Sequence, residues 1–166
     1  MMATHWEFIA ECLRAELADY GGLLRLFEEQ QQHLFCRDAG AVLRLANEIE
    51  TQARTLAECR ARREAAVAAF AEAHRRPTTS SLRALLPDIE PAARPLLAAL
   101  INEVNALLHR VRRTSRHNHT LLSRTVELHQ DTLQQLRPNA FTKTYSPAGR
   151  VSVAAAHVAS TLRAAG

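Results

Sequence analysis

The sequence predicts an all-α protein: an elongated antiparallel bundle of three long helices with coiled-coil-like seams, one short helix between the second and third, and a flexible C-terminal tail. Apolar residues recur at alternating steps of three and four along three long stretches, which is the heptad spacing of packed helices. Aromatic residues make up only 5% of the 166 residues and there are five glycines, so strand and hairpin signals are scarce. This length suits one core, with the bundle over 1–137 and the tail over 138–166.

The first helix is predicted over residues 5–36. Thr4 and Glu7 have the spacing of a capping box, in which a hydroxyl and a carboxylate accept from the first free amides. Gln31 is polar at a position where the heptad pattern expects an apolar side chain. The other seam positions are apolar and aromatic: Trp6, Ile9, Leu13, Leu17, Tyr20, Leu24, Phe27 and Leu34.

The second helix is predicted over 39–74, with Asp38 as its N-cap. Because so few residues separate it from the first helix, the two must pack antiparallel as a long hairpin. Its seam keeps the same spacing and includes three polar or weakly polar positions. The seam residues are Val42, Leu45, Ile49, Gln52, Leu56, Cys59, Arg63, Ala66 and Phe70.

A short helix is predicted over 80–86, capped by Ser80 or Thr79, and prolines then lead into a third long helix over 92–136. Thr114 and Asn118 make the centre of the third seam polar, and buried polar seam residues often fix register or partner. The seam is Leu97, Leu100, Val104, Leu107, Val111, Thr114, Asn118, Leu121 or Leu122, Thr125 and Leu128.

Charge is unevenly distributed along the chain. Residues 1–37 carry three arginines against six acidic residues, and residues 77–166 carry eleven basic residues against five acidic ones. An acidic first helix and a basic third helix would complement each other if they packed antiparallel. The arginines Arg110, Arg112, Arg113, Arg116 and Arg124 are the best candidates for binding nucleic acid. No aromatic residues interleave with them for base stacking, so a solvated face partly paired to the first helix is favoured.

No pattern in the chain indicates catalysis, a cofactor or a metal. His117 and His119 are two residues apart on a helix and point in different directions, and no metal-ligand spacing, phosphate loop or nucleophile elbow is present. The three cysteines are odd in number and lie on helices, as expected of reduced thiols in a reducing compartment. There is no signal peptide and no stretch long enough to insert into a membrane. We therefore expect a cytoplasmic binding protein without enzyme activity.

The tail shows no helical or strand period over 138–150, and residues 151–164 are compatible with a short amphipathic helix. At His117-Asn118-His119-Thr120-Leu121-Leu122 the third helix resembles the FlgN family, whose last helix carries an Asn-x-x-Leu-Leu element. Thr144-Tyr145-Ser146-Pro147-Ala148-Gly149 is similar to the Tyr-Gly-x-x-Gly-like element of that family's tail, with Ser146 where glycine is usual.

The resemblance implies a chaperone of the flagellar type III export apparatus. It implies that the C-terminal helices of the hook-associated, or hook–filament junction, proteins bind the third helix, where Asn118, Leu121 and Leu122 match the family's element, although these residues could equally serve to hold the hairpin together. The polar seam suits a surface that exchanges partners, so the candidate client-binding residues are Val111, Thr114, Asn118, Leu121, Leu122 and Thr125. It also implies docking of the tail, at Tyr145, Pro147 and Gly149, to the cytoplasmic domain of the export gate, with the export ATPase complex as a further partner. A structural coiled-coil adaptor, with weak self-association, and less favourably a basic-helix nucleic-acid binder are the alternatives.

Overall fold

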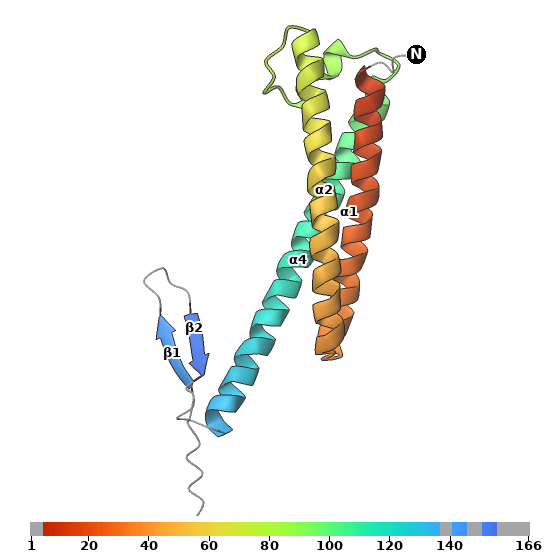
Figure 1. Ribbon diagram of the computed structural model, residues 1–166. Coiled ribbons are helices and arrows are strands. Elements are labelled where there is room, and N and C mark those ends of the chain that lie inside the picture. The colour runs from red at the N-terminus through yellow and green to blue at the C-terminus, as the bar shows by residue number, and fades with distance from the viewer. Residues whose placement is uncertain (1–4, 137–140, 146–150, 156–166) are drawn as a thin grey trace, which may run out of the picture. The chain divides into compact units, whose positions relative to one another are not determined.

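The computed structural model describes residues 5–136, 141–145 and 151–155, and the chain divides into two units, Met1–His119 and Thr120–Gly166. The three long helices are α1 (His5–Phe35), α2 (Ala39–Ala73) and α4 (Arg94–Leu136). Between α2 and α4 lie the short helix α3 (Leu82–Leu85) and the 3₁₀ turn η1 (Leu86–Asp88). The predicted fold class is confirmed, and each helix begins and ends within two residues of its predicted bounds (Figure 1).

α1 and α2 form an antiparallel hairpin. Arg37 adopts a left-handed conformation with φ of 57°, which ends α1 and reverses the chain. The side chain of Asp38 then accepts a hydrogen bond of 3.0 Å from the amide of Ala41. Asp38 is therefore the N-cap of α2, as the sequence predicts. The two helices lie side by side along their length (Figure 1).

The connector after α2 differs in one detail from the prediction. Ser81, rather than Ser80 or Thr79, caps α3, and its hydroxyl accepts from the amide of Ala84 at 3.3 Å. The amide of Ser80 instead donates to the carbonyl of Pro77, so Ser80 belongs to the preceding turn. The guanidinium of Arg94 donates to two carbonyls of the connector, at 2.8 Å each, and so fixes the start of α4.

Within the Met1–His119 unit, α4 runs parallel to α1, so the acidic first helix and the basic third helix do not form the antiparallel pair considered above. Leu13 lines a cavity with Val104, and fourteen residues further along each helix Phe27 meets Asn118. Because α2 reverses the chain and the connector reverses it again, the first and third helices must point the same way. The basic and acidic helices still meet, and Arg110 lies 3.9 Å from Glu28.

One hydrophobic core joins the helices and the connector of this unit. The seam residues Ile9, Leu45 and Leu97 are among the most deeply buried side chains. Ile89 and Ala93 of the connector are buried with them and close the end of the bundle. All three predicted seams therefore supply the core of this unit, since the heptad positions of each helix face its neighbours.

Part of the predicted tail is a β-hairpin. β1 (Phe141–Tyr145) pairs antiparallel with β2 (Val151–Ala155), and Tyr145 lies opposite Val151. Over Val151–Ala155 the structure therefore has strand where the sequence pattern favoured a helix over 151–164. β-Branched residues in both strands, together with Phe141 and Tyr145 in β1, favour the extended pairing. Residues 156–164 of the expected helix, and the rest of the tail expected to be flexible, lie outside the described residues.

Candidate functional site

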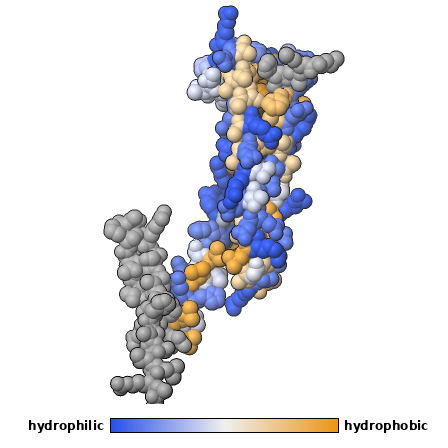
Figure 2. All heavy atoms as spheres, viewed as in Figure 1, coloured by the Kyte–Doolittle hydropathy of each residue, from blue (hydrophilic) through white to orange (hydrophobic). Residues whose placement is uncertain are grey.

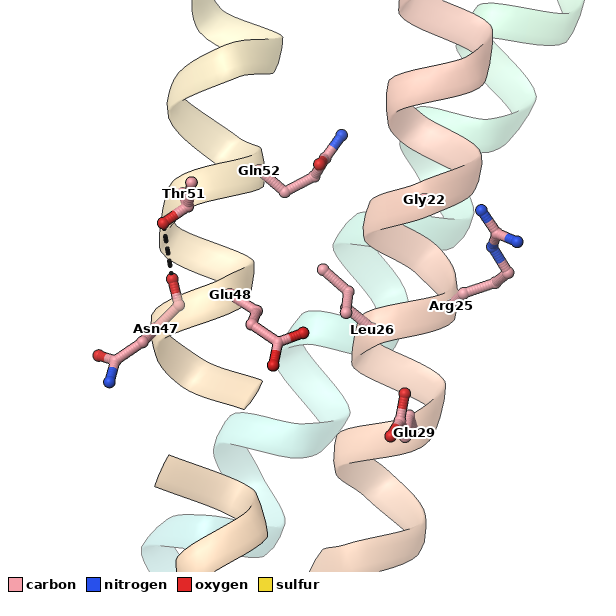
Figure 3. Close-up of a pocket in the computed structure, with 8 residues that line it drawn as sticks. All are labelled: Gly22, Arg25, Leu26, Glu29, Asn47, Glu48, Thr51 and Gln52. Carbon is pink, nitrogen blue, oxygen red and sulfur yellow. Dashed lines mark hydrogen bonds between the residues drawn. The ribbon is translucent and has the colours of Figure 1, made fainter. Parts of the chain in front are cut away.

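The groove between α1 and α2 has a volume of about 660 Å³ and is lined by side chains of both charges (Figure 3). Arg25 and Glu29 come from α1, and Glu48 comes from α2. The Gln52 side chain extends from α2 toward α1, where its amide donates to Asp19 Oδ1 at 3.2 Å (Figure 3). Gln52 is thus a polar seam residue that links the two helices.

The chemistry of this groove does not point to catalysis. The hydroxyl of Thr51 donates to the backbone carbonyl of Asn47 at 3.0 Å, which is the dashed line in Figure 3. A nucleophile would instead need an adjacent base that is itself held by a third group. Over the described ranges of the chain, no cluster of three histidine, cysteine or acidic side chains is placed to hold a metal ion.

Arg63, the charged residue in the second seam, pairs with a buried carboxylate. Its Nε donates to Oε1 of Glu16, whose side chain is fully buried. Among the described residues, Glu16 Oε2 has no hydrogen-bond partner. The Glu16–Arg63 pair therefore ties α1 to α2 at a position where both helices otherwise present apolar side chains. The heptad spacing predicts that Arg63 lies at the interface between the helices. It does not predict the partner of Arg63, because Glu16 lies outside the predicted seam of the first helix.

Burial in the bundle also raises the pKa of two thiols and one phenol. Desolvation raises the pKa of the Cys12 and Cys59 thiols and of the Tyr20 hydroxyl above their ordinary values. All three cysteines are free, and only Cys36 is exposed. The two buried cysteines act as small apolar side chains in the bundle, as the sequence predicts, whereas Cys36 follows the last residue of α1 and does not fit that prediction.

Asn118 is the centre of a polar link between three helices. Its Nδ2 donates to the carbonyl of Phe27 at 2.7 Å and to Oε1 of Gln30 at 3.2 Å. The amide of Gln30 in turn donates to the carbonyl of Val42, at 3.5 Å. α4, α1 and α2 are thereby joined, so Asn118 fixes the register of α4 against the hairpin.

The predicted client-binding residues fall into two groups. Val111 and Asn118 are buried in the bundle and Thr114 is half-buried, so these side chains serve the core of the Met1–His119 unit. Leu121 and Thr125 are half-buried and Leu122 is exposed, all three in the second unit. The Thr125 hydroxyl donates to the Leu121 carbonyl at 2.9 Å and is occupied within its own helix.

The last part of α4 carries an exposed apolar face, visible in orange along this segment in Figure 2. Its side chains are between 42% and 74% exposed. At 100° per residue they fall within an arc of about 160°, less than half of the helix circumference, which they share with Thr125, His129 and Thr132. The members of this face are Leu122, Val126, Leu128, Leu133 and Leu136.

Sequence reasoning found only part of this face. Leu122 was predicted as a site residue and Leu128 as a seam residue, whereas Val126, Leu133 and Leu136 were missed. A signal was present, because Leu122, Val126, Leu133 and Leu136 follow one another at steps of four, seven and three. The third seam runs beside this stripe on the same helix, through Leu121, Thr125 and Leu128.

The predicted gate-docking residues lie beyond α4. Tyr145 ends strand β1, opposite Val151 in β2. Pro147 and Gly149 lie outside the described residues. The pairing of the two strands places Tyr145 directly opposite Val151, the residues on either side of the 146–150 connection.

None of the helices in the described ranges is both long and apolar enough to span a bilayer. Comparison of the chain with curated proteins and with solved structures gave no match. The sequence model of the family described as FlgN protein matches residues 2–152, which includes the bundle, β1 and the start of β2. With nearly its whole length matched, the chain belongs to the FlgN family of flagellar export chaperones.

Proposed function

We propose that this protein is a cytoplasmic, non-enzymatic export chaperone that binds the C-terminal helices of hook–filament junction proteins through the apolar face of α4. The observation that carries the proposal is the exposure of Leu122, Val126, Leu128, Leu133 and Leu136 on one side of a continuous helix. Exposed apolar surface of this kind is uncommon unless it binds a partner. A client helix laid along it would bury apolar side chains of both partners and prevent the client from assembling early.

Delivery to the cytoplasmic domain of the export gate would then depend on the segment after α4. Tyr145 has few rotatable bonds and a large amphipathic ring, which suits an aromatic anchor in an interface. The family relationship supports a role in flagellar export in general. Docking through Tyr145, Pro147 and Gly149, and contact with the export ATPase complex, belong to the same proposal.

The client experiment is a calorimetric titration of the full chain with a peptide from the C-terminus of a hook–filament junction protein of the same genome. The test variant carries Leu122→Glu and Leu133→Glu, which place charges on the apolar face. The matched control carries Ser123→Glu and Gln134→Glu at adjacent positions, 100° further around the helix. Both variants add the same charge to the same helix.

We expect saturable one-to-one binding to the wild-type chain. Each leucine would bury roughly half of its side chain, worth about 1 kcal/mol, so the test variant should bind at least about tenfold more weakly. The control should stay within about threefold. Equal affinities for the two variants, or no binding by a folded wild-type chain, would remove client binding from this face.

The adaptor alternative predicts a different outcome in the same samples. If the apolar face joins two copies of the chain, sedimentation will show a stable dimer that Leu122→Glu with Leu133→Glu dissociates. A chain truncated after Arg137 separates the two roles further. A truncated chaperone should still bind the client peptide but no longer bind the export gate. A truncated adaptor should keep its oligomeric state without the tail.

A further inference from the structure

The middle of α4 has one sign of charge. Between Glu103 and Glu127 the sequence contains five arginines, three histidines and no acidic residue. Of these arginines, Arg110 has its partner Glu28 on α1 at 3.9 Å. Arg112 forms no ion pair with the described residues, although α1 carries acidic side chains of its own. The unit Met1–His119 therefore presents positive charge that its own helices do not fully neutralise.

This charge borders a groove between α1 and α4, which we name the basic groove. Its volume is about 590 Å³, and its floor is formed by Leu23, Phe27 and Val111. Leu23 and Val111 are buried and Phe27 is half-buried. The floor is thus the edge of the hydrophobic core, and Phe27 is its partly exposed member.

The rim of the basic groove is cationic. His109, Arg112 and Arg116 line it and are all exposed. The guanidinium of Arg116 donates from Nε to the carbonyl of Arg112 at 3.3 Å, which holds the two arginines on the same side of α4. The groove therefore combines an apolar floor with the guanidinium of Arg112, which can bind a carboxylate, beside the positive charge of Arg116.

We propose that the basic groove is a docking site for an acidic amphipathic segment of another protein. Apolar side chains of that segment would rest on Leu23, Phe27 and Val111, and its carboxylates would pair with Arg112 and Arg116. The charge complementarity selects an acidic partner, and the apolar floor selects a peptide. A single-stranded nucleic acid would gain most from exposed aromatic rings for base stacking, and the exposed lining residues His109, Arg112 and Arg116 include no Phe, Tyr or Trp.

The basic groove and the apolar face of α4 use different residues in different units of the chain. The inference therefore goes beyond the proposed client site. It predicts that the protein binds two partners, with a client helix on the apolar face and an acidic segment in the basic groove. Because the two sites share no side chain, the failure of one proposal leaves the other testable.

The experiment uses the full chain and three designed peptides, each an eighteen-residue amphipathic helix of about five turns with leucines on one face. The opposite face carries glutamate, glutamine or lysine. We expect the glutamate peptide to bind, the glutamine peptide to bind at least about tenfold more weakly, and the lysine peptide not to bind. The affinity of the glutamate peptide should fall as salt is added, because the arginines are exposed.

Two variants with the same change in charge then locate the site. Arg112→Glu with Arg116→Glu reverses the rim, and should weaken the glutamate peptide about a hundredfold, since two attractions become repulsions. Arg113→Glu with Arg124→Glu makes the same change elsewhere on α4, and should weaken it less than about fivefold. Circular dichroism confirms that both variants keep their helices.

A third variant tests the groove rather than the charge. Ser115 is half-buried and lines the groove, so Ser115→Trp should fill it and lower the affinity for the glutamate peptide at least about tenfold. Leu122→Glu with Leu133→Glu should leave this binding unchanged, which excludes the apolar face of α4 as the site. If both pairs of arginine variants behave alike, or Ser115→Trp has no effect, attraction is diffuse and the proposal is overturned. A single-stranded oligonucleotide that binds more tightly than the peptide and displaces it would overturn it in favour of nucleic acid.

Discussion

The buried Glu16–Arg63 pair gives the sharpest test of how polar groups act inside this bundle. Replacing Arg63 with methionine keeps most of the side-chain length and removes the charge. Glu16, fully buried, would then have a carboxylate without any partner, because its Oε2 already has none among the described residues. Breaking a buried ion pair in this way typically costs about 3–5 kcal/mol.

The two partners differ in exposure, and this difference sets the size of each effect. The side chain of Arg63 is 21% exposed and that of Glu16 is 0% exposed. Arg63→Met should therefore cost about 3 kcal/mol, at the low end because water reaches one edge of the pair. Glu16→Leu should cost only about 1 kcal/mol, since the guanidinium left behind can turn to solvent. The double variant should lie within about 1 kcal/mol of wild type, because an apolar pair needs no desolvation.

The measurement is urea unfolding of the four proteins, followed by far-UV circular dichroism, with the free energy of unfolding taken from each transition. The slopes should agree, so that the midpoints report stability alone. The double-mutant cycle should give a coupling energy of about 4 kcal/mol, since the single losses sum to about that value and the double variant stays near wild type. Equal losses for Arg63→Met and Glu16→Leu, or a double variant as unstable as Arg63→Met, would refute the role assigned to burial.

Three further predictions concern the polar link, the thiols and one surface ion pair. Asn118→Leu should lower the free energy of unfolding by about 1–2 kcal/mol, because it removes the buried amide that joins α4 to α1; Ser123→Leu is the control in the same unfolding assay. A thiol reagent at neutral pH should label Cys36 rapidly and the two buried cysteines only on unfolding, and three equally fast thiols would contradict the packing. Arg76 hydrogen-bonds to Asp88 and holds the pKa of that carboxyl below its usual value. The folded pKa of Asp88 is depressed, so the small stabilisation should be present above about pH 4 and lost as pH falls through the folded pKa. Unfolding of wild type and Asp88→Asn at a series of pH values measures this stabilisation. A difference in stability between the two proteins that stays unchanged at low pH would contradict the pairing.

The parallel arrangement of α1 and α4 changes how the charge pattern is understood. Opposite charges on the two helices make the expectation of an antiparallel pair reasonable, but the direction of α4 is set by the chain path. Two reversals, one at Arg37 and one through the connector that ends at Arg94, return the third helix to the direction of the first. Opposite charges on the two parallel helices still attract where they meet, as Arg110 of α4 and Glu28 of α1 do.

Much of the fold followed from local patterns. The heptad spacing placed the three seams and most of the core, since helix periodicity and burial act within one segment at a time. Asp38 was found as a cap from its position alone. The strands at Phe141–Tyr145 and Val151–Ala155 were missed because a helical pattern of small residues competes with strand propensity when the partner strand is unknown.

For the candidate sites too, some features followed from the sequence and others only from the tertiary structure. The sequence by itself determined that the chain is a helical bundle, and its Asn-x-x-Leu-Leu and tail elements indicated the family that the comparison confirmed. Only the tertiary structure decided that Val111 and Asn118 lie in the core while Leu133 and Leu136 are exposed. It also decided that Glu16 is the partner of Arg63. The physical reason is that periodicity records which side of a helix is apolar, whereas burial and pairing depend on whether another helix, distant in sequence, comes to lie against that side.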